Sequence, residues 1–100
     1  MNPQDFGITV EVEDITPEQA AKYLSYNAEH RPIKQSKVDK YAGQMARGEW
    51  ALNGKVLVFD SNGRLLGGQH RLSACVQSGV TLRILTVKGI DPSVFKKDEE

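Results

Sequence analysis

The sequence predicts a small α/β domain of the α+β type, with about four strands in one mixed sheet and three helices. Polarity alternates with a period of two in one segment, which is typical of a strand. Apolar residues follow helical spacing in three other segments, and short runs rich in β-branched residues indicate further strands. The 100 residues allow one domain with a modest core. We therefore expect a single domain over residues 1–100, with a flexible charged tail over about 91–100.

The first half of the chain is predicted to form one strand and two helices. Residues 8–13 alternate in polarity, as in a half-buried strand. Thr16 is a candidate N-cap for a helix over 17–27. A second helix is expected to begin at Ser36, with Asp39 as its capping-box partner.

The second half is predicted to form a hairpin, a third helix and a last strand. The continuous apolar run 56–59 indicates a strand that is covered on both faces. The Asp-Ser-Asn-Gly turn over 60–63 then leads into a returning strand over 64–66. A helix from Gln69 to the glycine at position 79 and a strand over 81–87 complete the domain.

Composition excludes several classes of protein. Thirteen Lys and Arg balance thirteen Asp and Glu, so global electrostatics cannot hold a nucleic acid. The single cysteine, Cys75, allows neither an internal disulfide nor a thiolate metal cluster, and we predict no metal site. No apolar run is long enough for a membrane span, and the start lacks signal-peptide features, so we expect a cytoplasmic protein that does not bind membranes.

Functional groups concentrate where the predicted strand over 64–66 runs into the third helix through Gly67 and Gly68. The N–H groups of a first helical turn and the helix dipole favour an anion such as phosphate. Arg71 offers a planar fork for phosphate oxygens, and His70 offers a donor that could also move a proton. The alternative is a tight strand-to-helix turn with a solvated arginine.

A second basic cluster lies between residues 30 and 47 of this neutral chain. This segment contains five basic residues and a single acid, Asp39, so its local net charge is +4. The basic residues are Arg31, Lys34, Lys37, Lys40 and Arg47. Lys37 lies in the first turn of the second predicted helix, and Arg31 precedes a proline in a loop, where functional residues concentrate. For Lys40 and Arg47 a solvated helix face is the simpler interpretation.

Over about residues 8–90, the two clusters resemble the ParB/sulfiredoxin-like superfamily. Sulfiredoxins carry Arg-Pro-Leu, Lys-Val and Gly-Gly-Cys-His-Arg in this order. The corresponding residues are 31–33 (Arg-Pro-Ile), 37–38 (Lys-Val) and 67–71 (Gly-Gly-Gln-His-Arg). Phage and bacterial ParB-like proteins with a Gly-Gln-His-Arg-Leu motif are also similar, and their preceding Gly-x-Trp matches residues 48–50.

The resemblance implies a site for ATP or CTP, with or without Mg²⁺, in a bacterial or phage-infected cell. The implied phosphate ligands are Lys37, Gly67, Gly68, Gln69, His70 and Arg71. The implied catalytic positions are Arg31, Glu29 as a general base and His70. Gln69 stands where sulfiredoxins need a cysteine, so sulfinic acid reduction is excluded, and Cys75 better suits the core. No helix-turn-helix region follows residue 90, so a complete segregation protein is not expected.

Three functions stay open at this stage. The first is nucleotide phosphate binding, with NTP hydrolysis or phosphotransfer as its extension. The second is a DNA-binding or nuclease-type ParB-like accessory protein of a phage or plasmid. The third is a catalytically inactive module that regulates or binds another protein. Neutral net charge and the absence of interleaved aromatic residues place DNA binding second.

Overall fold

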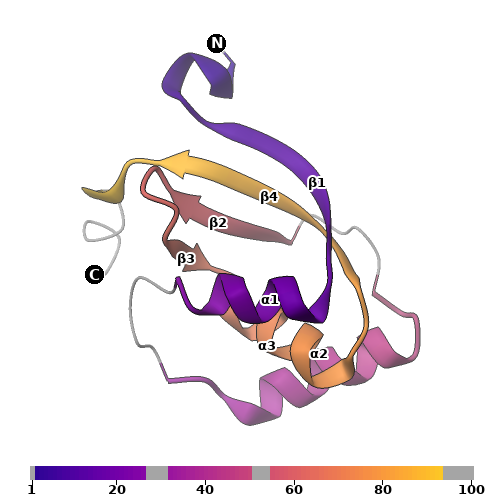
Figure 1. Ribbon diagram of the computed structural model, residues 1–100. Helices are drawn as coiled ribbons and strands as arrows, with labels where there is room; N and C mark the ends of the chain where they lie inside the picture. The colour runs from indigo at the N-terminus through magenta and orange to yellow at the C-terminus, as the bar shows by residue number, and fades with distance from the viewer. Residues whose placement is uncertain (1, 27–31, 51–54, 94–100) are drawn as a thin grey trace.

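In a computed structural model of the chain, the described residues are 2–26, 32–50 and 55–93. They form a four-stranded mixed sheet with three α-helices, which confirms the predicted fold class (Figure 1). A short 3₁₀ helix, η1 (Pro3–Phe6), precedes the sheet and was not predicted. Most of the predicted tail lies outside the described residues. No helix in the described ranges has the length and apolar character that a membrane crossing requires.

The strands are arranged in the order β1-β4-β2-β3. The edge strand β1 (Thr9–Ile15) pairs antiparallel with β4 (Leu82–Ile90). Strand β4 then pairs in parallel with β2 (Val56–Asp60), which pairs antiparallel with the short strand β3 (Leu65–Gly67). Strands β1 and β4 run two and three residues beyond their predicted ends. Strand β1 pairs along its whole length with residues 82–88 of β4, and Ile90 of β4 pairs with Asp60 of β2.

Helix α1 (Pro17–Leu24) follows β1 after a single residue, Thr16. The Thr16 hydroxyl accepts a hydrogen bond from the backbone N–H of Gln19 over 3.1 Å, which confirms the predicted N-cap. The helix ends slightly earlier than predicted, with Ser25 as its C-cap.

Helix α2 (Gln35–Ala46) begins one residue before the predicted start, and the predicted capping box is wrong. Lys34, not Ser36, occupies the N-cap, and its side chain makes no capping hydrogen bond. The predicted apolar face is confirmed, because Val38 and Met45 are buried in the core.

Asp39 joins two helices instead of capping one. Its carboxylate accepts hydrogen bonds from Nε2 of Gln35 over 2.8 Å and from Nε2 of Gln77 over 2.9 Å. Gln77 belongs to α3 (Gln69–Ser78), so these bonds tie α2 to α3. They also lower the pKa of the Asp39 carboxyl, the bond from Gln77 first.

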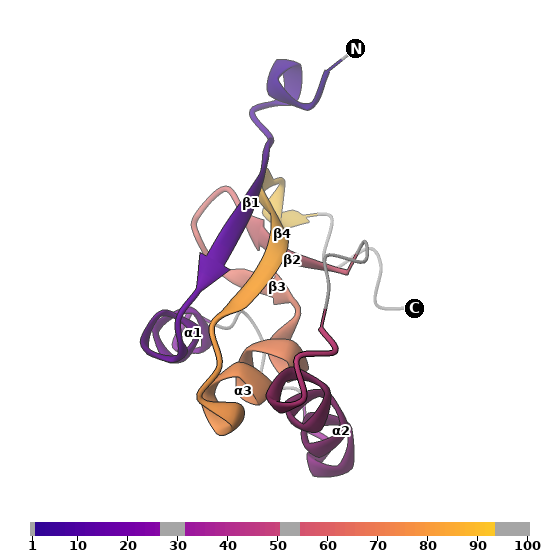
Figure 2. The same cartoon turned by 90° about the vertical axis from the view of Figure 1, so that its right-hand side faces the viewer.

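The core lies between the sheet and the helices, and α3 packs between α1 and α2 (Figure 2). Its buried hydrophobic residues are Ile15, Ala20, Val38, Ala42, Met45, Leu57, Phe59, Leu65, Leu72, Ala74, Cys75, Leu82 and Ile84. Cys75 is a core residue, as predicted, and its thiol donates to the Val80 carbonyl over 3.1 Å. Burial raises the pKa of this thiol, which keeps it unreactive.

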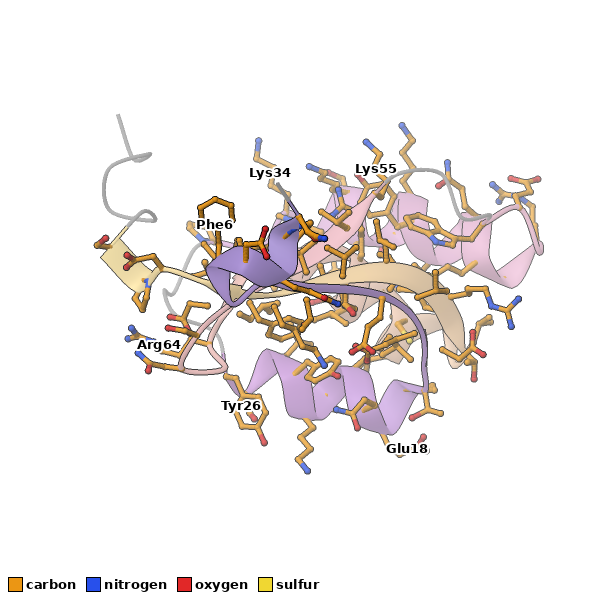
Figure 3. All side chains as sticks on the ribbon, turned by 90° about the horizontal axis from the view of Figure 1, so that it is seen from above. Phe6, Glu18, Tyr26, Lys34, Lys55 and Arg64 are labelled. Atoms are coloured by element: carbon orange, nitrogen blue, oxygen red, sulfur yellow. The ribbon has the colours of Figure 1, made fainter. Side chains whose placement is uncertain are left out.

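Strand β2 is covered fully on one face only, so the prediction of two covered faces is wrong. Leu57 and Phe59 are buried, whereas Val56 and Val58, which alternate with them, are only partly buried. Tyr23 of α1 packs on the buried face, with its ring centroid 4.8 Å from that of Phe59. Glu18 and Tyr26, near the ends of α1, lie on the opposite side of the sheet from Lys34 and Lys55 (Figure 3).

Candidate functional site

The two glycines at the junction of β3 and α3 have different structural roles. Gly68 is the N-cap of α3 and has a φ of 104°, a left-handed conformation that glycine adopts readily. A Cβ at this position would collide with Cδ2 of Leu57 and would lie 3.4 Å from its Cα. A Cβ on Gly67 would meet only Val58, at an ordinary 4.0 Å. Close packing on β2 therefore explains Gly68 without any ligand.

The first turn of α3 begins directly at this junction. The first helical hydrogen bond runs from the N–H of Leu72 to the carbonyl of Gly68 over 3.0 Å. The N–H groups that precede it have no acceptor within the helix, and the positive end of the helix dipole lies there. This turn therefore has the polarity that an anion requires.

Arg71 reaches from this turn toward the start of β2. Its Nη1 donates a hydrogen bond to the carbonyl of Val56 over 2.9 Å. Its Nε is buried and has no acceptor among the described residues. A buried N–H without an acceptor costs folding free energy, so this Nε is an unsatisfied donor beside the start of β2.

His70 connects the first turn of α3 to the start of α2. Its Nε2 accepts a hydrogen bond from the backbone N–H of Lys34 over 3.2 Å, which requires a neutral ring with its proton on Nδ1. Partial burial lowers the pKa of His70, and the positive charges of Lys37, Lys34 and Arg71 lower it further. Three cations from two helices thus act on one uncharged imidazole.

The fold brings together several of the residues that the sequence singles out. Lys37, His70 and Arg71 interact electrostatically, and the glycines and Gln69 lie at the same junction. Lys34 completes the group and was not predicted as a site residue, although it was counted in the basic segment. Its role arises from its position at the N-cap of α2, next to His70.

Other predicted site residues do not join this group. Glu29 and Arg31 lie outside the described residues, so their catalytic roles stay predictions. Arg47 forms an ion pair with Glu49, with Nε 3.0 Å from Oε2, at the opposite end of α2. Lys40 is exposed, in agreement with a solvated helix face.

The chemistry of the gathered side chains suits phosphate and does not suit Mg²⁺. Lysine, arginine and a histidine whose Nε2 is already engaged do not supply the oxygen ligands that Mg²⁺ prefers. Within the described ranges, no three His, Cys, Asp or Glu side chains gather in a way that could hold a metal ion.

Comparisons with models of known families, with curated proteins and with solved structures give no match to this chain. The resemblance to the ParB/sulfiredoxin-like superfamily therefore rests on its motifs and their order alone. The site must be interpreted from its own geometry.

Proposed function

We propose that this protein binds the phosphates of a nucleotide, ATP or CTP, where the N-termini of α2 and α3 meet. The observation that carries the proposal is the hydrogen bond from the backbone N–H of Lys34 to a neutral His70, which joins the starts of α2 and α3. Lys34, Lys37 and Arg71 lie within electrostatic range of that ring. The cations come from two helix starts that this hydrogen bond joins, so all three act on the same ring. Phosphate groups provide the negative charge that this arrangement lacks.

The hydrogen bonding of Arg71 also supports this proposal. Its guanidinium is held by the Val56 carbonyl through Nη1, while Nε keeps an unused, buried N–H. A phosphate at the first turn of α3 would be attracted by the positive charge of this guanidinium and by the positive end of the helix dipole. Because the arginine is already oriented, little side-chain entropy would be lost on binding.

The proposal covers binding and assigns no catalytic step. Hydrolysis or phosphotransfer needs a group that moves a proton, and Glu29, the predicted base, lies outside the described residues. The Nε2 of His70 is occupied by the N–H of Lys34, so this nitrogen is not free to act as a base.

DNA binding is the less favoured alternative. Arg47, at the end of the basic segment, is paired with Glu49, so the unpaired positive charge of α2 lies in its first half, at Lys34, Lys37 and Lys40. A compact group of cations matches a nucleotide better than a DNA backbone, which needs contacts spread over several phosphates. A module that only binds another protein would leave the unused N–H of Arg71 unexplained.

Isothermal titration with ATP, CTP and inorganic triphosphate tests the proposal. The variant Lys37→Ala should weaken binding about tenfold, as expected for a lost charge-assisted hydrogen bond. Lys40→Ala is the matched control, because Lys40 is an exposed lysine of the same helix that does not act on His70. Its affinity should equal that of the unmodified protein.

Two results would reject nucleotide binding. One is the absence of heat with all three ligands at millimolar concentration. The other is an equal loss of affinity in Lys37→Ala and Lys40→Ala, which would indicate nonspecific attraction to the helix. Titration with a short DNA duplex distinguishes DNA binding from nucleotide binding. The affinity for DNA should decrease in both variants and should fall steeply with salt.

A further inference from the structure

Strand β1 forms an open edge of the sheet, far from the proposed nucleotide site. Strand β4 pairs with it on one side, and no described strand pairs with the other (Figure 1). Its seven residues keep a regular register with β4, without a bulge. The charged residues of the strand are all acidic, and it contains neither lysine nor proline, two residues that commonly protect sheet edges from pairing.

The two faces of this edge carry different chemistry. Val10 and Val12 point to one face and are 48% and 50% exposed. Glu11 points to the other face, and its side chain is 56% exposed. An incoming strand would therefore meet apolar side chains on one face and a carboxylate on the other.

Glu11 is the acid that remains open to a further cation. The neighbouring Glu13 is saturated, because its carboxylate accepts from Tyr23 over 2.8 Å, from Thr86 over 2.7 Å and from Lys88 over 3.0 Å. Lys88 lies farther from Glu11, with Nζ 3.6 Å from Oε1. Glu11 is 56% exposed, and its carboxylate has only this longer contact with Lys88 where Glu13 has three donors.

We propose that β1 binds an extended segment of another protein by strand addition. That segment carries a lysine or arginine beside Glu11 and β-branched residues beside Val10 and Val12. Main-chain hydrogen bonds along the edge supply the affinity, and the alternation of apolar and basic residues supplies the specificity. This proposal does not depend on nucleotide binding.

A second copy of this chain is a poor occupant of the edge. A two-fold antiparallel pair centred on Val12 matches all seven residues of β1, but it sets Glu11 opposite Glu13 of the copy. A pair centred on Glu11 sets the two copies of Glu11 against each other. Like charges directly opposite each other destabilise a strand pair, so a partner with basic residues fits better.

The test uses a synthetic peptide, Thr-Ile-Lys-Ile-Arg-Ile-Thr, titrated into the full chain and followed by amide chemical shifts and by calorimetry. Shifts should concentrate on β1 and its neighbour β4. The same peptide with glutamate in place of lysine and arginine should not bind. Glu11→Lys should weaken binding of the basic peptide about tenfold, because an attraction becomes a repulsion.

Glu49→Lys is the matched control for Glu11→Lys. Its side chain is 55% exposed, it also lies beside a basic residue, and the substitution changes the net charge equally. It should leave the affinity for the peptide unchanged, and circular dichroism should show that both variants are folded.

Three results would overturn the proposal. Shifts that cluster away from β1 would place the peptide elsewhere. Equal affinity of Glu11→Lys and Glu49→Lys would remove the role of Glu11. A dimer without peptide in sedimentation experiments, disrupted by a charge change at Glu11, would assign the edge to a second copy.

Discussion

The backbone N–H of Lys34 donates a hydrogen bond to Nε2 of His70 over 3.2 Å, although the two residues are 36 positions apart. This bond joins the N-terminus of α2 to the first turn of α3. It exists only while Nε2 is unprotonated. The protonation of one side chain therefore controls how two helix starts are held together.

We expect His70 to make the stability of the protein depend on pH. Its pKa is lowered in the folded state, by burial and by three cations, so the unfolded state binds a proton first as the pH falls. The contribution of His70 is complete above its unfolded pKa of about 6.5. It is lost as the pH falls from there through the lower folded pKa. Urea unfolding at pH 7.5 and pH 5.5 should show this loss.

His70→Ala should lower stability by about 1 kcal/mol at pH 7.5, the worth of one hydrogen bond, and should reduce the loss in acid. His30→Ala removes the other histidine of the chain and serves as the control. It should retain the acid-dependent loss. If His30→Ala flattens the pH profile and His70→Ala does not, the assignment to His70 is wrong.

The two adjacent glycines should respond differently to alanine. Gly68→Ala combines a left-handed backbone with a collision against Leu57, so we expect a loss of about 2–4 kcal/mol. Gly67→Ala finds ordinary contact distances and should cost less than about 1 kcal/mol. Thermal unfolding of the two variants measures the difference. Similar losses would show that Gly68 is not held against β2.

Asp60 should be essential for the turn between β2 and β3. Its buried Oδ1 accepts the N–H of Asn62 and the N–H of Arg64, each over 2.9 Å, and Oδ2 accepts Nε of Arg64 over 3.1 Å. Asp60→Ala leaves two backbone donors without their acceptor and should cost about 3 kcal/mol in chemical denaturation. Arg64→Ala removes the half-exposed partner of this buried carboxylate but leaves both backbone donors in place, so it should cost less than Asp60→Ala. The reverse order would contradict this account.

Glu13 should stabilise the contact between α1 and the sheet at neutral pH. Burial alone would raise its pKa, but hydrogen bonds from Thr86, Lys88 and Tyr23 outweigh burial and lower the pKa below 4.5. Its contribution is thus present above the unfolded pKa and is lost as the pH falls through the lower folded pKa. Glu13→Gln should lower the free energy of unfolding by about 1–2 kcal/mol at pH 7. This difference from the unmodified protein should disappear in acid. Glu11→Gln removes only an exposed carboxylate 3.6 Å from Lys88 and should cost less than about 1 kcal/mol at pH 7.

Local patterns predict the elements of this fold well, because each depends on neighbouring residues. The strand before Thr16, the cap at Thr16 and the turn at Asp60 are confirmed. The alternation in that strand is misleading about burial, because Val10 and Val12 lie on the exposed face and only Ile15, at the end of the strand, is buried. The capping box at Ser36 fails because Asp39 finds stronger partners on α2 and α3 than the helix start provides. A competing partner from a distant segment cannot be recognised from local spacing.

The candidate site could be predicted only in part, because local spacing does not show which distant residues meet. His70 and Arg71 stand out because a glycine pair precedes them, and Lys37 stands out in a basic segment. Neither pattern indicates that Lys34 presents its backbone N–H to His70, or that Nε of Arg71 is buried without an acceptor.

By itself, the sequence determined the class of the fold, the order of its elements and the residue types available for binding. These follow from periodicity, turn residues and composition, which act over a few positions. Only the tertiary structure decided that β1 and β4, at opposite ends of the chain, pair and leave an open edge. It also decided that two helix starts meet at His70. Both outcomes depend on how the elements pack, which is set by contacts between residues far apart in the chain.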